Sequence, residues 1–245
     1  MNHTNSNLDH SGNKNQPHGI RWRLGSLVHM IGMMGSLGDF WSSDLNRAAV
    51  DFVDPQSGQV VLDLGAGLGP ATVEAAKRVA PSGRVIAVDP SSTMRRVLSL
   101  RRLWQSDRPV IDIRDGGAEV LPVLSGSIDA AWAVNAVHHF DDLALAAGEL
   151  ARVLKPGGRL LLIEEDLTGG GHASHSGEGA HSHGPDPVDQ EHLEELLTTA
   201  GLSVTGSDSR TVGGVVASVT TASKSPEKSR QGADRPESSP SSELG

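Results

Sequence analysis

A short apolar run followed at once by three closely spaced glycines constrains the fold more than any other feature. Residues 60–64 read Val-Val-Leu-Asp-Leu, and Gly65, Gly67 and Gly69 come directly after them. An apolar run of this length, bounded by turn-forming residues, predicts a buried parallel strand. The helical pattern of residues 71–78 predicts a helix after the glycines. The stretch therefore predicts a strand, a tight turn and a helix start, an arrangement that lets backbone approach a nucleotide closely.

Composition narrows the class of protein. The chain of 245 residues is long enough for one α/β domain with tails. Its 30 acidic and 21 basic residues give a net charge of −9, which disfavours nucleic acid as a partner. Cysteine is absent, which removes disulfides, thiolate metal sites and a cysteine nucleophile. No apolar run approaches the ~20 residues of a membrane span, and the N-terminus lacks a signal-peptide layout, so we expect a cytoplasmic protein.

A dinucleotide site is the first rival interpretation of the glycine stretch. It requires the pattern G-x-G-x-x-G, but Pro70 stands where the third glycine would be. Asp63 lies two residues before the first glycine, and its carboxylate would repel a pyrophosphate in a partly buried cleft. A ligand that carries an ammonium and a sulfonium group would tolerate that carboxylate. A nicotinamide-dependent dehydrogenase is therefore the weakest alternative.

A second acid follows the next predicted strand, at residues 84–89. Asp89 lies 20 residues beyond Gly69, the distance at which a strand-end carboxylate reaches a ribose diol in a βαβ unit. A strand-end Asp can instead cap the helix that follows it. Here Ser91 or Ser92 could provide the cap, so Asp89 is predicted to bind ribose. Met94, one turn into that helix, is expected near an adenine or in the core.

The remaining apolar patterns predict a doubly wound α/β fold. Further strands are expected at residues 110–114, 127–134 and 159–166, helices at 143–154 and 188–200, and two alternating strands at 202–207 and 212–220. The segment Asn135 to His138 follows the fourth strand, which borders the glycine loop at the switch point of such a sheet. His138 and His139 are candidate general bases, although one or both could serve only to hold the loop. Glu165, at the end of the fifth strand, is a third candidate.

Several segments, in this order, resemble motifs of one enzyme family. They are D-L-G-A-G-L-G at 63–69, the strand-end Asp89, A-E-V-L-P at 118–122, V-H-H-F at 137–140 and L-K-P-G-G-R-L-L-L at 154–162. Together they resemble the class I S-adenosylmethionine (SAM)-dependent methyltransferases of the ubiquinone/menaquinone-biosynthesis-like branch (methyltransferase type 11), over roughly residues 39–220. The resemblance implies a Rossmann-like, seven-stranded, mostly parallel sheet with an antiparallel C-terminal hairpin.

The resemblance also implies a set of cofactor-binding residues. Asp63 and the glycine backbone would hold the methionine moiety, Asp89 the ribose, and Ala118 with Glu119 the adenine region. The chain departs from the family pattern at Gly117, which takes the place of an acid, while Asp115 lies two residues early. The expected cofactor-binding residues are Asp63, Gly65, Ala66, Gly67, Gly69, Asp89, Pro90, Met94, Ala118, Glu119, Asn135 and Val137.

Low-complexity segments flank and interrupt the expected methyltransferase domain, residues 20–221. Residues 1–19 and 222–245 are predicted to be disordered tails. Residues 20–53 carry apolar and Met-rich helical patterns, which indicate either an edge helix or a cap over an apolar substrate. Residues 167–187 form a His/Gly-rich loop with His172, His175, His181 and His183, whose spacing could bind a metal. Ordering such a loop is entropically costly, so no metal is predicted.

The predicted function is methyl transfer from SAM to a small-molecule acceptor by in-line displacement, an activity of class EC 2.1.1.-. The apolar residues of the cap favour a hydrophobic acceptor. The enzyme has mainly to align the nucleophile, the methyl carbon and the sulfur. Two alternatives remain open: a SAM-binding regulatory pseudo-enzyme, and a metal-binding protein that uses the His-rich loop. Nothing in the sequence indicates the oligomeric state.

Overall fold

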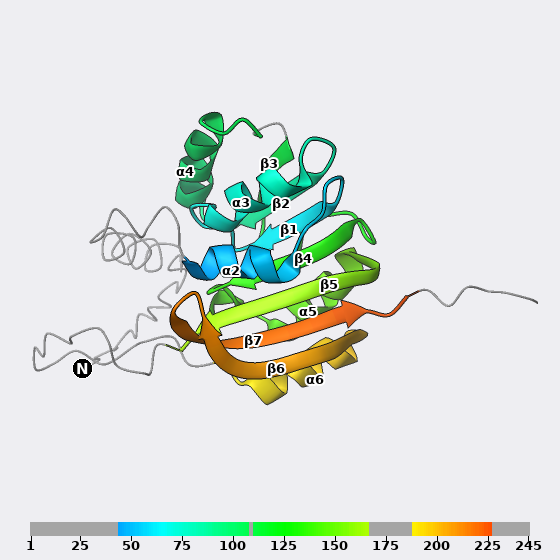
Figure 1. Cartoon of the computed structure of the whole chain (residues 1–245). Helices are drawn as coiled ribbons and strands as arrows, with labels where there is room; N and C mark the ends of the chain where they lie inside the picture. Colours follow the sequence, from blue (N-terminus) through cyan, green and yellow to red (C-terminus); the bar gives the residue numbers. More distant parts are fainter. Residues whose placement is uncertain (1–43, 108–109, 167–187, 227–245) are drawn as a thin grey trace, which may run out of the picture. The chain divides into compact units, whose positions relative to one another are not determined.

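A seven-stranded sheet organises the chain. The computed structural model describes residues 44–107, 110–166 and 188–226. The strand order is β3-β2-β1-β4-β5-β7-β6, in which the first five strands are parallel and β7 runs antiparallel to both of its neighbours (Figure 1). The predicted doubly wound sheet with an antiparallel hairpin is confirmed. The strands are β1 Val60–Leu64, β2 Arg84–Asp89, β3 Ile111–Asp115, β4 Ile128–Val134, β5 Leu154–Glu165, β6 Leu202–Val212 and β7 Val215–Lys224.

Helices cover both faces of this sheet. One face carries α2, α3 and α4, and the other carries α5 and α6 (Figure 1). The helices are α2 Asp44–Val53, α3 Pro70–Val79, α4 Ser92–Leu103, the 3₁₀ turn η3 Val137–His139, α5 Leu143–Val153 and α6 Gln190–Thr199. Strand order reverses between β1 and β4, because β1 connects outward to β2 while β4 connects to β5 on the other side. Ligands of doubly wound sheets bind at this switch point.

Strand alternation divides the core into two layers. Val61 packs with α2 and α3, whereas its neighbour Leu62 packs with α5 and α6. The same alternation places Leu161 and Leu162 on opposite faces of β5, because successive side chains of a strand point in opposite directions. Trp132 of β4 is completely buried in the α2 and α3 layer. Burial on both faces explains why the central strands read as continuous apolar runs.

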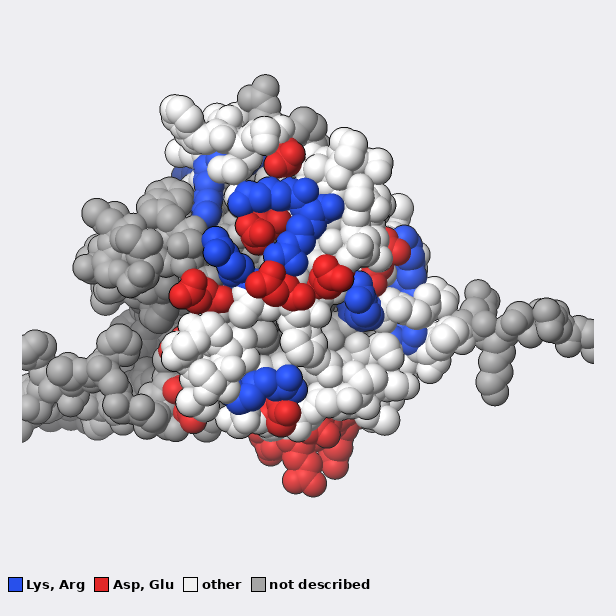
Figure 2. Space-filling model, in the orientation of Figure 1, with Lys and Arg blue, Asp and Glu red and all other residues white. Residues whose placement is uncertain are grey.

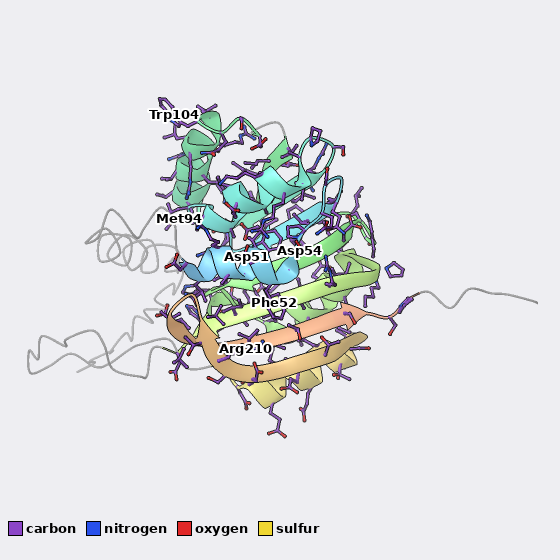
Figure 3. The ribbon with its side chains drawn as sticks, viewed as in Figure 1. Asp51, Phe52, Asp54, Met94, Trp104 and Arg210 are labelled. Carbon is purple, nitrogen blue, oxygen red and sulfur yellow. The ribbon has the colours of Figure 1, made fainter. Side chains whose placement is uncertain are left out.

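The C-terminal hairpin contacts the start of α2. A Cβ atom at Gly213, in the turn between β6 and β7, would lie 2.4 Å from the Leu45 nitrogen, so glycine is needed there. The Arg210 guanidinium of β6 lies 5.6 Å from the centre of the Phe52 ring (Figure 3). This cation–π contact and the tight turn hold α2 against the sheet edge. Residues 20–43 of the expected cap lie outside the described residues, as do residues 1–19, 167–187 and 227–245.

Several strand boundaries differ from the sequence prediction. β5 begins at Leu154 rather than at residue 159, because Leu154 already pairs with Ile128 before a register shift. β6 continues to Val212 and β7 begins only at Val215 rather than at residue 212, since the polar stretch 208–211 pairs with β7 through its backbone and carries no apolar signal. β7 continues through Lys224, past the expected start of the tail at residue 222. The Lys224 ammonium donates hydrogen bonds to the carbonyls of Ala151 and Leu154 at 2.7 and 2.9 Å, which fixes this strand end to the end of α5.

Candidate active site

The loop between β1 and α3 contains three glycines, which share one backbone conformation but differ in how closely they are packed. Gly65, Gly67 and Gly69 have φ of 70°, 53° and 76°, a region that other residues rarely adopt. A Cβ atom at Gly65 would lie 2.5 Å from the Cβ of Ala136, and one at Gly69 would lie 2.1 Å from the Cδ1 of Leu98. At Gly67 the nearest atom would be 3.9 Å away. Gly65 and Gly69 therefore permit close packing, whereas a Cβ atom at Gly67 would meet its nearest neighbour only at an ordinary van der Waals distance.

We expect Gly69→Ala to destabilise the fold much more than Gly67→Ala. Both substitutions force alanine to a positive φ, at a cost of roughly 1–2 kcal/mol. Only Gly69→Ala also displaces the fully buried Leu98, and overpacking of this kind costs roughly 1–3 kcal/mol more. Urea unfolding should show this additional loss for Gly69→Ala. Equal losses for the two variants would contradict the packing role of Gly69.

The Asp89 carboxylate lies beside this loop. Its Oδ2 accepts a hydrogen bond from the Gly67 nitrogen at 2.8 Å, and its Oδ1 accepts one from the Ser91 nitrogen at 2.8 Å. Ser91 caps α4 through its own hydroxyl, which accepts from the Met94 nitrogen, so Asp89 is not the cap. Burial raises the pKa of Asp89, and the two amide hydrogen bonds oppose that shift. Each oxygen accepts one hydrogen bond from these amides and has capacity for another, as a diol would require.

Asp63 lies beneath the loop and contacts α3. Its carboxyl is almost fully buried, and its Oδ2 accepts a hydrogen bond from the Thr72 hydroxyl at 2.5 Å. Burial raises the pKa of Asp63 to about 6, although the Thr72 hydrogen bond lowers it in part. The structure therefore gives this predicted cofactor residue a second role, in which it connects the end of β1 to the first turn of α3.

The raised pKa of Asp63 predicts a measurable pH dependence of stability. The folded protein holds this proton more tightly than the unfolded chain, whose Asp pKa is about 3.9. Wild type should therefore lose about 2 kcal/mol relative to Asp63→Asn as the pH rises from 4 to 7, with little further change above pH 7. Urea unfolding of both proteins across this range measures the difference. A difference that does not change with pH would contradict the raised pKa.

The loop between β3 and β4 differs from the expected adenine site. Asp115 pairs with Arg95 at 2.8 Å, and Arg95 also donates to the backbone carbonyl of Asp89 at 2.7 Å. The Glu119 carboxylate accepts hydrogen bonds from the nitrogens of Asp141 and Asp142, just before α5. Glu119 thus connects this loop to the segment after η3, while Ala118 is buried against the core. Pro90, a predicted cofactor-binding residue, follows Asp89 directly, and Met94, expected near an adenine or in the core, lies in the first turn of α4 (Figure 3 labels Met94).

The ends of β4 and β5 are joined by two adjacent glutamates. Glu164 Oε1 accepts hydrogen bonds from the nitrogens of Ala136 and Val137 at 2.8 and 2.7 Å. Its Oε2 lies 2.5 Å from Nδ1 of His138. Glu165 instead faces Asn135, whose Oδ1 accepts from the Glu165 nitrogen at 2.8 Å. Glu164 therefore fixes both the η3 turn and the imidazole ring.

This geometry assigns the tautomer of His138. An ionised carboxylate can only accept hydrogen bonds, so Nδ1 of His138 carries the proton and donates to Glu164. In the neutral ring, Nε2 then keeps a lone pair and can accept a proton. The side chains of His138 and Glu164 are only 14% and 15% exposed, so the pair is shielded from bulk water. His139 lies against His138, with ring centres 3.9 Å apart, but is more exposed.

Comparison with known proteins agrees with this site. Residues 62–162 match the family described as a methyltransferase domain. The chain is 31% identical over 132 residues to nocamycin O-methyltransferase of Saccharothrix syringae, covering 54% of this chain and 46% of that protein. It is 32% identical over 118 residues to the ubiquinone/menaquinone biosynthesis C-methyltransferase UbiE of Hahella chejuensis, covering 48% and 47%. A SAM-dependent methyltransferase from Aquifex aeolicus has the same fold, with a TM-score of 0.60 and 18% identity over 80% of this chain and 97% of that one.

Residues 62–162 therefore match a methyltransferase domain, and the chain has the fold of a SAM-dependent methyltransferase. The chain spans about half the length of these two curated relatives. The glycine loop, Asp89, the Ala118 loop and η3 all lie within the matched segment.

Two residues of the candidate site lie just beyond the matched segment, at the end of β5. They are Glu164 and Glu165, and only Glu165 was predicted as a site residue. The alternation of side chains along β5 could have identified Glu164. Glu164 lies on the same face of β5 as Leu160 and Leu162, and that face packs against Val137. Within the described residues, no helix is long and apolar enough to cross a membrane, and no three acidic or histidine side chains converge on a possible metal site. The His-rich loop lies outside those residues.

Proposed function

We propose that this protein transfers a methyl group from SAM to a small-molecule acceptor. The observation that carries the proposal is the hydrogen bond from the glycine loop, at Gly67, to the Asp89 carboxylate beside the switch point of the sheet. The match to the methyltransferase domain supports it. The net charge of −9 argues against a nucleic-acid substrate.

The residues present fit SAM in both shape and charge. Asp89 would accept hydrogen bonds from the ribose hydroxyls, because each of its oxygens keeps capacity beyond its backbone donor. The methionine moiety would lie against the glycine loop, because Gly67 has no Cβ atom to block its approach. Pro90, Met94, Ala118 and Glu119 would surround the adenine, and Asn135 with Val137 would border the methyl group. When bound, SAM supplies a methyl carbon on a sulfonium that is already a good leaving group.

The pair of His138 and Glu164 would supply a general base. The Nε2 lone pair of His138 can accept a proton from the acceptor as its nucleophilic atom attacks. Glu164 would hold the ring in the required tautomer and stabilise the imidazolium that forms, as a carboxylate beside a catalytic histidine can. Methyl transfer to a hydroxyl oxygen or to an acidic carbon both release a proton. The named activities of the two curated relatives, O- and C-methyl transfer, are of these kinds.

The acceptor class that this base favours is a small hydrophobic molecule with a phenol, enol or similarly acidic group. Calorimetry with SAM and NAD in parallel tests the cofactor, and saturable binding of SAM alone is expected. Formation of S-adenosylhomocysteine with a panel of phenolic and enolic acceptors then tests turnover. Binding of SAM without turnover on any acceptor would favour a regulatory pseudo-enzyme, whereas preference for NAD would reject the proposal.

A further inference from the structure

The outward face of α4 carries large apolar side chains that no other described element covers. Leu100, Leu103 and Trp104 are 63%, 56% and 87% exposed. Their spacing of three and four residues places them on one side of the helix. Leu98 is the one fully buried side chain of α4 and faces the sheet. Trp104 lies at the outer end of the helix, away from the sheet (Figure 3).

The same helix is strongly basic. Residues 92–103 contain Arg95, Arg96, Arg101 and Arg102 and no acidic residue. Arg95 is paired with Asp115, and Arg102 donates to the Ile111 carbonyl, a contact that leaves its charge uncompensated. Among residues 44–107, 110–166 and 188–226, neither Arg96 nor Arg102 forms an ion pair with a carboxylate. Arg96 is exposed one turn from Leu100, so apolar and cationic groups share one surface.

The basic helix stands at one end of an acidic protein. α4 packs on β3 and β2, whereas α6 packs on β6 and β7 at the other end of the sheet. α6 carries Glu191, Glu194 and Glu195, and Figure 2 shows a cluster of acidic side chains at that end. With a net charge of −9, the chain as a whole would be repelled by an anionic surface. Such a surface would therefore attract the α4 end and repel the α6 end, which fixes the orientation of contact.

We propose that the outer face of α4, defined by Arg96, Leu100, Leu103 and Trp104, binds the surface of anionic phospholipid bilayers. A basic helix with exposed Leu and Trp lies in the plane of such an interface, with its apolar side chains below the headgroups. Trp suits this depth because its ring is apolar while its N–H stays close to water. Guanidinium groups bind lipid phosphates through charge-assisted hydrogen bonds. The inference does not depend on the proposed methyl transfer.

Vesicle co-sedimentation of the full chain tests the proposal. We expect binding to vesicles of phosphatidylcholine with 30% phosphatidylglycerol to be at least tenfold stronger than to pure phosphatidylcholine, and to weaken as salt rises from 50 to 500 mM. Leu103→Ser with Trp104→Ser should reduce binding at least tenfold, and Arg96→Glu at least threefold. Leu124→Ser is the control, because Leu124 is a leucine outside α4 that is even more exposed, at 79%, and should change binding less than twofold.

Circular dichroism and thermal unfolding establish that each variant remains folded. Quenching of wild-type but not Trp104→Phe fluorescence by lipids brominated on their acyl chains would place Trp104 below the headgroups. Equal binding to neutral and anionic vesicles would overturn the proposal. So would unchanged binding of the α4 variants, a loss in Leu124→Ser as large as theirs, or no vesicle binding together with an α4-dependent change in oligomeric state.

Discussion

Asp89→Ala should weaken SAM binding at least 100-fold, a loss of about 2.7 kcal/mol. The substitution removes the carboxylate that would accept the ribose hydroxyls, and it leaves the Gly67 and Ser91 amides without their acceptor. Loss of an acceptor from partly buried amides costs roughly 1–3 kcal/mol, and the freed glycine loop would also lose its fixed conformation. Isothermal titration calorimetry of wild type and variant with SAM measures the change.

Asp115→Ala is the matched control for this experiment. Asp115 is aligned with Asp89 on the neighbouring strand, but it is exposed and pairs with Arg95 rather than with the glycine loop. We expect it to change SAM affinity less than threefold, because an exposed ion pair contributes little. An equal loss in both variants would show that general electrostatics, and not the position of Asp89, determines binding.

Glu164→Gln should reduce the rate of methyl transfer by about 100-fold or more while SAM affinity changes less than threefold. The glutamine oxygen can still accept from the Ala136 and Val137 amides, so the η3 turn should persist. Its amide group would donate to Nδ1 of His138 and so move the ring proton to Nε2. The nitrogen that should accept the proton of the acceptor would then already carry one. The turnover number with an acceptor from the phenolic and enolic panel gives the rate.

Glu165→Gln distinguishes between the two adjacent glutamates. Glu165 contacts Asn135 and not His138, so its substitution should change the rate less than threefold. The ¹⁵N shifts of the His138 ring provide a measurement that needs no acceptor: Nδ1 should be protonated in wild type and in Glu165→Gln, and unprotonated in Glu164→Gln. A large rate loss in Glu165→Gln alone would make Glu165 the base, as the sequence suggested.

The order of elements was predictable because each carries its own local signal. The buried strands are continuous apolar runs, and the glycine loop stands where positive φ is required. β6 was harder, since residues 208–211 are polar and pair with β7 through the backbone. No pattern in a single sequence reports such pairing. The start of β5 was missed for a similar reason, because Leu154 pairs with β4 within a motif that reads as a turn.

The candidate site was predictable in position but less so in its contacts. Asp89 and the glycines follow from spacing within one βαβ unit. The contact between Glu164 and His138 joins residues 26 positions apart, one in β5 and the other in the η3 turn after β4, so only the sheet register brings them together. Asp63 shows the same limit, because its burial against Thr72 depends on how α3 packs. The sequence predicts a helix after Asp89 but does not show which side of that helix the sheet covers. The exposed apolar face of α4 could therefore not be predicted.

The position of β7 has a consequence for synthesis of the chain on the ribosome. β7 is the last described strand to be made, yet it lies inside the sheet, between β5 and β6. Until residue 224 has left the exit tunnel, β5 lacks its antiparallel neighbour and exposes the edge of an apolar strand. A nascent chain that pauses, or one truncated within residues 215–224, would present this edge to other chains. Expression conditions that speed release, or a chaperone present during translation, should therefore improve the soluble yield more than changes made after purification.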